Sequence, residues 1–186
     1  VDGVMVARGD LGIEIPLEKL PFHQKQIVAL ANKYQKISLV ATDLLKSMVL
    51  ENNPSRAEVA DIYNAVFDKC DALVLCDETT IGVDPVNCIE VIKKVVTEAE
   101  NDFPYKENLD ETFKLVSQDV TSTIAYSVVN ADLILNAKGI LANTMSGYTA
   151  RKISYFRPRS IIIGLSPKLS TLRSLTLNYG VLPILV

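Results

Sequence analysis

Six short apolar runs, separated by longer amphipathic stretches, constrain the fold of this sequence more than any other feature. They are rich in Val, Ile and Leu and do not alternate with polar residues, which is typical of strands buried on both faces of a parallel sheet. Strand and helix follow one another in turn, and this order predicts an α/β fold. The apolar runs are Val4–Val6, Ile37–Ala41, Ala72–Leu75, Gly139–Ala142, Ile161–Ile163 and Val181–Val186.

The stretches between these runs are predicted helices, and caps mark the starts of two of them. Ser55 and Glu58 have the spacing of a capping box, and Asp84 precedes a proline that suits the first helical position. Gly180 is expected to stop the last helix. The predicted helices cover Leu17–Tyr34, Ser55–Cys70, Pro85–Glu100, Asp119–Asn130, Thr149–Phe156 and Ser170–Tyr179.

The segment 101–110 is polar and contains a proline, so we interpret it as a linker between two α/β parts. The composition is that of a soluble globular chain, with 48% hydrophobic and 22% charged residues. A net charge of −3 argues against a nucleic-acid partner. No run approaches the roughly 18 apolar residues of a membrane helix. We therefore expect neither nucleic acid nor membrane as a partner.

The ends and the cysteines say little about chemistry. The first residues lack the basic leader of a signal peptide, and both ends lie in apolar runs, so we expect them to be cut points. Cys70, Cys76 and Cys88 match no zinc spacing and are expected to be reduced thiols of a cytoplasmic protein. His23 has no acid or cysteine near it in sequence and is expected to be a surface or packing residue.

Functional groups of α/β proteins gather after the carboxyl ends of the strands, and three successive strands here are followed by polar residues. The first strand is followed by Arg8, Gly9 and Asp10. Either the Asp10 carboxylate binds a cation beside the glycine, or Arg8 and Asp10 form an ion pair that braces a turn. Thr42 follows the second, as a substrate-binding hydroxyl or a helix cap. The acidic segment 76–82 follows the third, as part of a site or as a solvated loop.

A fourth candidate is the segment 143–151, which leads from a strand into a helix. Its hydroxyls, free backbone N–H groups and the positive end of the helix dipole suit a phosphate. The alternative is ordinary capping of that helix by Ser146 or Thr149. The segment matches neither a Walker A motif nor a GxGxxG motif, so it does not indicate a nucleotide.

Taken together, these motifs resemble the pyruvate kinase family over essentially the whole chain. Residues 5–16 closely resemble the family segment MVARGDLGVEIP, and residues 40–48 resemble ATQMLESM. Residues 53–61 resemble the P-T-R-A-E-x-x-D start of a helix. Residues 75–85 resemble LSGETAKGxYP, and residues 144–159 resemble TxSGxTA followed by YRP.

The resemblance implies two incomplete domains. Residues 1–102 would be about the last three strand–helix units of a (β/α)8 TIM barrel, and residues 103–186 the first part of a parallel-sheet α/β C-terminal domain. It also implies phosphoryl transfer from phosphoenolpyruvate to ADP, giving pyruvate and ATP. Mg²⁺ or Mn²⁺ and K⁺ would be cofactors, and the enzyme would be a cytoplasmic homotetramer. Those family members that are regulated in this way bind a sugar-phosphate effector.

Roles of single residues follow from the same resemblance. Asp10 matches a ligand of the divalent cation and, with Gly9, a contact to phosphoenolpyruvate. Thr42 matches the catalytic threonine that contacts substrate near the proton delivered to the enolate. The loop that would hold an effector phosphate corresponds to Thr144, Ser146, Gly147, Tyr148 and Thr149.

The resemblance also implies what this segment lacks. The family's catalytic lysine, second metal-binding carboxylate, potassium site and lid domain precede the matched part, so we expect no turnover from the 186 residues alone. Asp43 replaces a Gln, Cys76 and Asp77 replace Ser-Gly, and Met145 and Tyr148 stand where effector-regulated forms have basic residues. These departures leave open a non-catalytic regulatory or oligomerisation module.

Overall fold

The computed structural model describes residues 1–116 and 119–186. The chain divides into two compact units, Val1–Phe103 and Pro104–Val186. Each unit contains one three-stranded sheet in which all strands are parallel and follow one another in chain order. The predicted α/β class is therefore confirmed, and each unit is described below by itself.

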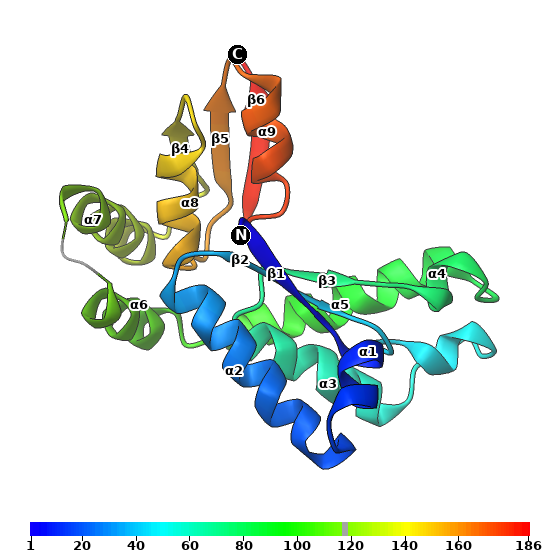
Figure 1. The fold of residues 1–186 in the computed structure, drawn as a ribbon. Helices are drawn as coiled ribbons and strands as arrows, with labels where there is room; N and C mark the ends of the chain where they lie inside the picture. The colour runs from blue at the N-terminus through cyan, green and yellow to red at the C-terminus, as the bar shows by residue number, and fades with distance from the viewer. Residues whose placement is uncertain (117–118) are drawn as a thin grey trace. The chain divides into compact units, whose positions relative to one another are not determined.

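Unit 1 has the architecture of a barrel wall. In Figure 1 its three long helices, α2, α3 and α5, lie on the same face of the sheet. Sequential parallel strands with helices on one side are the repeating unit of a TIM barrel, and three strands form only part of its wall. The elements are β1 (Gly3–Ala7), α1 (Arg8–Glu14), η1 (Leu17–Lys19), α2 (Leu20–Lys33), β2 (Ile37–Ala41), η2 (Lys46–Val49), α3 (Arg56–Phe67), β3 (Ala72–Val74), α4 (Asp77–Thr80) and α5 (Pro85–Asp102).

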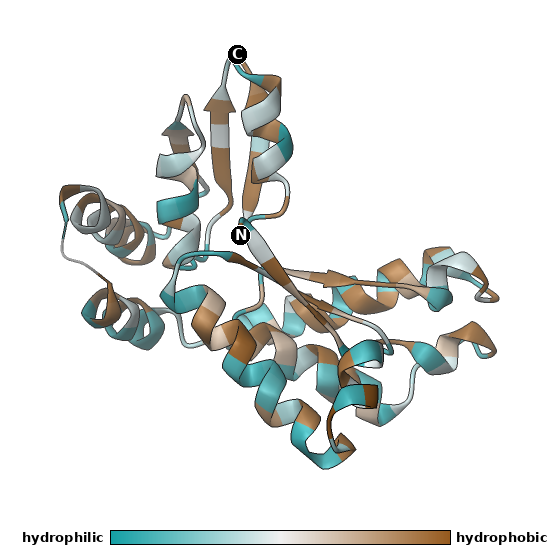
Figure 2. Ribbon diagram, viewed as in Figure 1, coloured by the Kyte–Doolittle hydropathy of each residue, from teal (hydrophilic) through white to brown (hydrophobic). Residues whose placement is uncertain are grey.

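The core of unit 1 lies between this sheet and its helices. Val6 and Val40 are adjacent in register and fully buried, and they pack with Val28 of α2 and Ile62 of α3. Figure 2 shows how strongly apolar residues concentrate on the strands. Met5 points to the opposite face of the sheet and is 54% exposed. The helices therefore cover one side of an apolar sheet, as the outer layer of a barrel does.

Unit 2 repeats the arrangement around its own sheet. A side chain at Gly164 would contact both Ala150 of α8 and Leu175 of α9, so these two helices cover the same face of β5. Phe156 is fully buried in the core of the unit. The elements are α6 (Tyr105–Leu115), α7 (Val120–Leu135), β4 (Ile140–Asn143), α8 (Tyr148–Tyr155), β5 (Ile162–Ser166), α9 (Leu169–Leu175) and β6 (Val181–Leu185).

The boundary between the two units falls within the predicted segment 101–110, but most of that segment is helical and not a linker. Helix α5 continues to Asp102 and α6 begins at Tyr105, so only two residues separate the helices. The polar composition of α6 concealed its apolar side, in which Leu109 is fully buried and Phe113 packs against the same core. A narrow apolar stripe on a charged helix is therefore sufficient for docking.

Both predicted N-caps are confirmed. Ser55 and Glu58 form the reciprocal capping box, and the Asp84 carboxylate accepts a hydrogen bond from the backbone N–H of Asn87. The last predicted helix is shorter than expected, because α9 ends at Leu175 and a turn leads to Gly180, whose φ is +66°. Across residues 1–116 and 119–186, no helix is long and apolar enough to cross a membrane.

Candidate functional site

The carboxyl ends of β1 and β2 bring two of the predicted site residues together. Ala7 and Ala41 are paired in register, so the residues that follow them, Arg8 and Thr42, emerge side by side. A Cβ atom added at Gly9 would lie 3.1 Å from the Thr42 Cγ2 methyl. Gly9 and Thr42 therefore approach so closely that a larger side chain at position 9 would crowd the Thr42 methyl, although 33 positions separate the two residues in the sequence.

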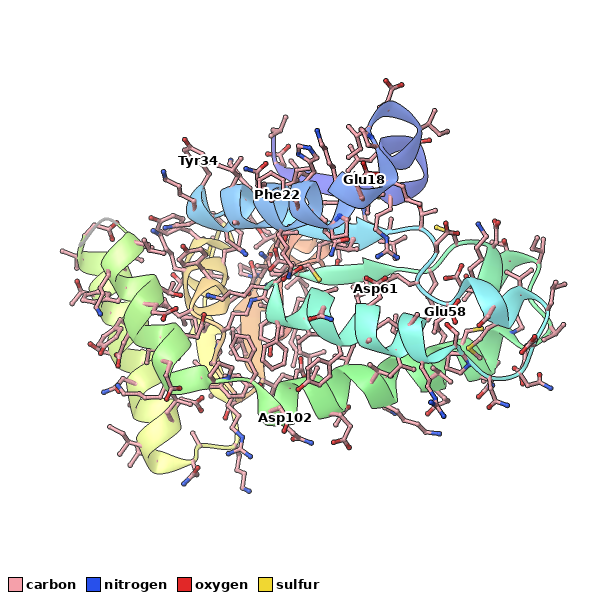
Figure 3. All side chains as sticks on the ribbon, turned by 90° about the horizontal axis from the view of Figure 1, so that it is seen from below. Glu18, Phe22, Tyr34, Glu58, Asp61 and Asp102 are labelled. Carbon is pink, nitrogen blue, oxygen red and sulfur yellow. The ribbon has the colours of Figure 1, made fainter. Side chains whose placement is uncertain are left out.

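Arg8 fastens this edge of the sheet. Its Nε and Nη2 atoms donate to the Thr42 carbonyl oxygen at 2.9 and 2.6 Å, and its Nη1 atom forms an ion pair with Asp61 of α3. The guanidinium is 9% exposed, and three of its donors are satisfied. Because the guanidinium is buried, removal of either partner would leave a charge that is not compensated, which is strongly destabilising. Figure 3 shows Asp61 and Glu58, both carried by α3.

The backbone at Thr42 is strained, which excludes the predicted helix cap. Thr42 and Asp43 have φ values of +79° and +55°, in the left-handed region that residues other than glycine rarely adopt. No helix begins directly after Thr42, since η2 starts only at Lys46. The Arg8 hydrogen bonds hold the Thr42 carbonyl in this conformation. Within the described residues the Thr42 hydroxyl has no hydrogen-bond partner, so it is free to contact a ligand.

Asp10 lies in the first turn of α1 and is exposed. The alternative that it pairs with Arg8 across a turn is wrong, because Arg8 pairs with Asp61 and the segment is helical. Asp10 has no ion-pair or hydrogen-bond partner in the described part of the chain. Its carboxylate oxygens are thus available to a cation. The described residues contain no cluster of three or more His, Cys, Asp or Glu side chains that could hold a metal by itself.

The acidic segment after β3 is not a solvated loop. It forms the short helix α4, in which Asp77 is exposed and Glu78 is only 2% exposed. The Glu78 carboxylate accepts hydrogen bonds from the backbone N–H groups of Leu45 at 3.2 Å and Cys76 at 2.9 Å. One buried carboxylate therefore joins the segments that follow β2 and β3.

A second carboxylate fixes the same segment from the other side. Glu58 accepts hydrogen bonds from the backbone N–H and the hydroxyl of Ser47, in addition to its capping bond with Ser55. Burial raises the pKa of the Glu58 carboxyl, but the hydrogen bonds from Ser47 and Ser55 outweigh it, so the net pKa is below the ordinary value. The chain that follows Thr42 is thus held by Arg8, Glu78 and Glu58.

In unit 2 the predicted phosphate loop connects β4 to α8. Gly147, with φ +82°, is the N-cap residue of α8, so the predicted capping by Ser146 or Thr149 is wrong. The loop is held by the Thr171 hydroxyl, which donates to the Met145 carbonyl oxygen at 3.0 Å. Thr144 is buried, whereas Ser146 and Thr149 are exposed.

Basic side chains lie close to this loop, although Met145 and Tyr148 are not basic themselves. A Cβ atom at Gly147 would lie 2.6 Å from Arg151 Nη1, so the guanidinium covers the glycine. The Lys152 ammonium lies 5.5 Å from the centre of the Tyr148 ring. No acidic residue occupies the first turn of α8. The Lys152 ammonium is buried and paired with Asp119 Oδ2 at 3.8 Å, so the loop offers its exposed hydroxyls and the Arg151 guanidinium.

The cysteine thiols and His23 belong to no group of metal-ligating side chains within residues 1–116 and 119–186. Cys70 and Cys88 are buried, Cys76 is half-buried, and all three are free thiols. His23 lies on α2 and stacks edge-on against Phe22. Sequence reasoning missed the roles of Arg8, Glu58 and Glu78 as anchors of the Thr42 segment. Only the capping-box spacing gave a signal, and it concerned Glu58. The bonds from Arg8 to Thr42 and Asp61 and from Leu45 to Glu78 join residues more than 30 positions apart.

Comparison with known proteins places both units in one family. The family model described as pyruvate kinase, barrel domain, matches residues 1–89, and the model described as pyruvate kinase, alpha/beta domain, matches residues 122–186. Pyruvate kinases of Staphylococcus aureus strains USA300 and NCTC 8325 are 41% identical over 183 residues, which is 98% of this chain and 31% of theirs.

A solved structure gives the same result. The crystal structure of a pyruvate kinase from Cryptosporidium parvum matches with a TM-score of 0.95 and 38% identity, over 100% of this chain and 38% of that chain. The chain thus spans about a third of the length of these relatives. Two family models, the sequence identity and the shared fold agree, and the chain belongs to the pyruvate kinase family.

Proposed function

We propose that this chain is the segment of a pyruvate kinase that supplies part of the phosphoenolpyruvate and metal site. The full-length protein would transfer the phosphoryl group of phosphoenolpyruvate to ADP and release pyruvate and ATP in glycolysis. The observation that carries the proposal is the close approach of Gly9 to the Thr42 side chain, with the Thr42 carbonyl fixed by Arg8. These residues come from adjacent strand ends, where TIM barrels place their active sites.

Asp10 and Gly9 would bind the phosphoryl group of phosphoenolpyruvate and the divalent cation. Their backbone N–H groups lie in the first turn of α1, where helical amides lack carbonyl acceptors and can donate to an anion. The exposed Asp10 carboxylate would provide one oxygen ligand for Mg²⁺ or Mn²⁺. That cation, when bound, neutralises the transferring phosphoryl group.

Thr42 would act at the other end of the substrate. When the phosphoryl group moves to ADP, the bond between phosphorus and the enol oxygen breaks, and the enolate must gain a proton on carbon to become pyruvate. The Thr42 hydroxyl, fixed in position by the strained backbone, would contact the substrate near that carbon and help to direct the proton.

This segment would not catalyse the reaction alone. Since no group of three possible metal ligands exists among residues 1–116 and 119–186, Asp10 needs ligands from elsewhere. We propose that the catalytic lysine, the second metal-binding carboxylate, the K⁺ site and the lid belong to other parts of the full-length protein. Residues 1–102 would then be the end of the barrel domain, and residues 103–186 the first part of the C-terminal domain.

The test is ADP-dependent pyruvate formation by the full-length protein with Mg²⁺, measured for the unsubstituted protein and for Asp10→Ala. We expect turnover that falls by at least about a hundredfold on substitution, because a metal ligand is lost. The 186-residue chain alone should form no pyruvate. Full-length protein without activity, or activity indifferent to Asp10→Ala, would instead favour a non-catalytic regulatory or oligomerisation module.

For unit 2 we propose that Thr144, Ser146, Gly147, Tyr148 and Thr149 bind a phosphate of a sugar-phosphate effector. The nearby Arg151 and the free hydroxyls support this role. Titration of sugar phosphates against the full-length protein and Thr149→Glu tests it, because a carboxylate at this exposed position would repel the phosphate. Equal activation of both proteins would show that this loop does not bind the phosphate of the effector.

Assembly and location follow the same family pattern. We propose a cytoplasmic homotetramer that takes phosphoenolpyruvate and ADP as its partners and binds neither nucleic acid nor membranes. Light scattering on the full-length protein measures the assembly directly, and a monomer would contradict the proposal.

A further inference from the structure

The edge of the sheet at which Thr42 lies is strongly negative. The three segments that follow the strands of unit 1, residues 8–16, 42–55 and 75–84, carry seven Asp and Glu residues against two cations, Arg8 and Lys46. Arg8 is buried and committed to Asp61 and the Thr42 carbonyl. Lys46 is therefore the exposed cation that these three segments present. An anionic substrate that approaches this edge encounters repulsion unless the acids are neutralised.

Lys46 pairs with the acid that directly follows Thr42 in the sequence. Its Nζ atom lies 2.9 Å from Asp43 Oδ1, and Asp43 is the residue directly after Thr42. The hydrogen bond and charge of Asp43, together with the charge of Asp77 on α4, raise the pKa of the Lys46 ammonium. The ammonium thus lies within the electrostatic influence of two carboxylates that belong to different segments.

The backbone around Lys46 is held on both sides, although its side chain is exposed. The preceding N–H group, of Leu45, donates to the buried Glu78, and the following one, of Ser47, donates to Glu58. Leu45 and Met48 are fully buried. The position of the Lys46 Cα atom is therefore fixed, and the ammonium is restricted to this edge.

Two residues of this segment differ in charge from the family segment that it resembles, and the two differences offset each other. Compared with ATQMLESM, which it resembles, this chain has Asp43 in place of Gln and Lys46 in place of Glu. The first change adds a negative charge beside Thr42, and the second replaces a negative charge by a positive one. Because the two side chains form an ion pair, the second change offsets the first.

We propose that Lys46 is a specificity-determining residue for the anionic substrate, since it neutralises Asp43 beside Thr42 and so lowers the cost of bringing a phosphate- and carboxylate-bearing molecule to this edge. The proposal rests on the proposed function of the site. It predicts an effect on substrate binding and none on the chemical step, because Lys46 does not belong to the reacting groups.

The test compares Lys46→Met with the unsubstituted full-length protein at low salt. We expect the KM for phosphoenolpyruvate to rise about threefold, as for one exposed charge pair, while kcat stays within about twofold. The rise should shrink in 0.5 M KCl, because salt screens exposed charges. Adding Asp43→Gln to Lys46→Met removes the unpaired carboxylate and should restore the KM.

The matched control is Lys36→Met, which removes the same charge immediately before β2, at the opposite edge of the sheet. It should leave the KM unchanged. An unchanged KM in Lys46→Met, or no recovery on adding Asp43→Gln, overturns the inference while the proposed function stands. If the unsubstituted protein forms no pyruvate, the proposed function fails and the inference fails with it.

Discussion

The two units use the same arrangement of strands and helices but fix their loops by different chemistry. In unit 1, Arg8, Glu58 and Glu78 hold the backbone after β2 with ionised side chains that reach across strands and helices. In unit 2, the Thr171 hydroxyl and the close packing at Gly147 hold the loop after β4. Charged anchors maintain a left-handed, strained backbone at Thr42, whereas the loop at Gly147 uses the residue that adopts this conformation without cost.

This difference is consistent with two tasks. A site that positions reacting groups needs a rigid backbone, which buried charge-assisted hydrogen bonds provide. The loop proposed to bind an effector instead leaves the Ser146 and Thr149 side chains exposed. If this comparison is correct, loss of an anchor should destabilise unit 1 strongly, and loss of Gly147 should destabilise unit 2.

The largest effect is expected from Glu78→Ala. The substitution leaves the buried N–H groups of Leu45 and Cys76 without an acceptor, which should cost unit 1 about 3 kcal/mol. Hydrogen exchange followed by mass spectrometry would show faster exchange in residues 42–49 and 75–80, and unchanged exchange in residues 119–186. Asp77→Ala is the matched control, because its side chain is exposed. Equal protection in Glu78→Ala and Asp77→Ala would show that the buried carboxylate is not an anchor.

An intermediate effect is expected from Gly147→Ala in unit 2. The new Cβ atom would meet Arg151 Nη1 at 2.6 Å and Leu175 Cδ2 at 3.2 Å, and the residue keeps a positive φ. We expect about 1–2 kcal/mol of destabilisation, measured by hydrogen exchange in residues 140–175.

Gly9→Ala in unit 1 is the counterpart of this substitution. Its Cβ atom would lie 3.1 Å from the Thr42 methyl and would displace the side chain by a few tenths of an ångström. The destabilisation should stay below about 1 kcal/mol, yet turnover of the full-length protein should fall, because Thr42 moves. Full turnover in Gly9→Ala would show that the position of the Thr42 side chain does not affect the reaction.

The smallest effect is a pH dependence that Glu58 confers on unit 1. The hydrogen bonds from Ser47 and Ser55 outweigh burial and lower the pKa of the Glu58 carboxyl below its ordinary value. Its contribution to stability is therefore present above that value and is lost as the pH falls through the lower, folded pKa. Chemical denaturation between pH 3 and pH 7 should show a weaker acid loss in Glu58→Gln than in the unsubstituted chain. Parallel acid losses in the two chains would contradict this role.

Much of the fold follows from local patterns in the sequence. The six apolar runs predicted the parallel strands, and the spacing of Ser55 and Glu58 predicted a capping box that the structure confirms. Helix α6 was missed because its apolar stripe is narrow, and α1 because a glycine within Arg8–Asp10 resembles a turn.

The anchors of the site were not predictable in this way. The Arg8–Asp61 pair spans 53 positions and the bond from Leu45 to Glu78 spans 33. Nothing local distinguishes Glu78, which is buried, from its exposed neighbour Asp77. The partners of long-range hydrogen bonds are set by the packing of strands and helices, so a single sequence indicates the edge of the sheet but not which charges hold it.

The division of tasks between the units is tested most directly by pyruvate formation in the full-length protein with Asp10→Ala and, separately, Thr149→Glu, each with and without sugar phosphates. We expect Asp10→Ala to lose turnover under all conditions, because the proposed reaction site lies in unit 1. We expect Thr149→Glu to keep its basal turnover and to lose only the response to the effector. Normal turnover in Asp10→Ala, or loss of basal turnover in Thr149→Glu, would contradict this division of tasks between the two units.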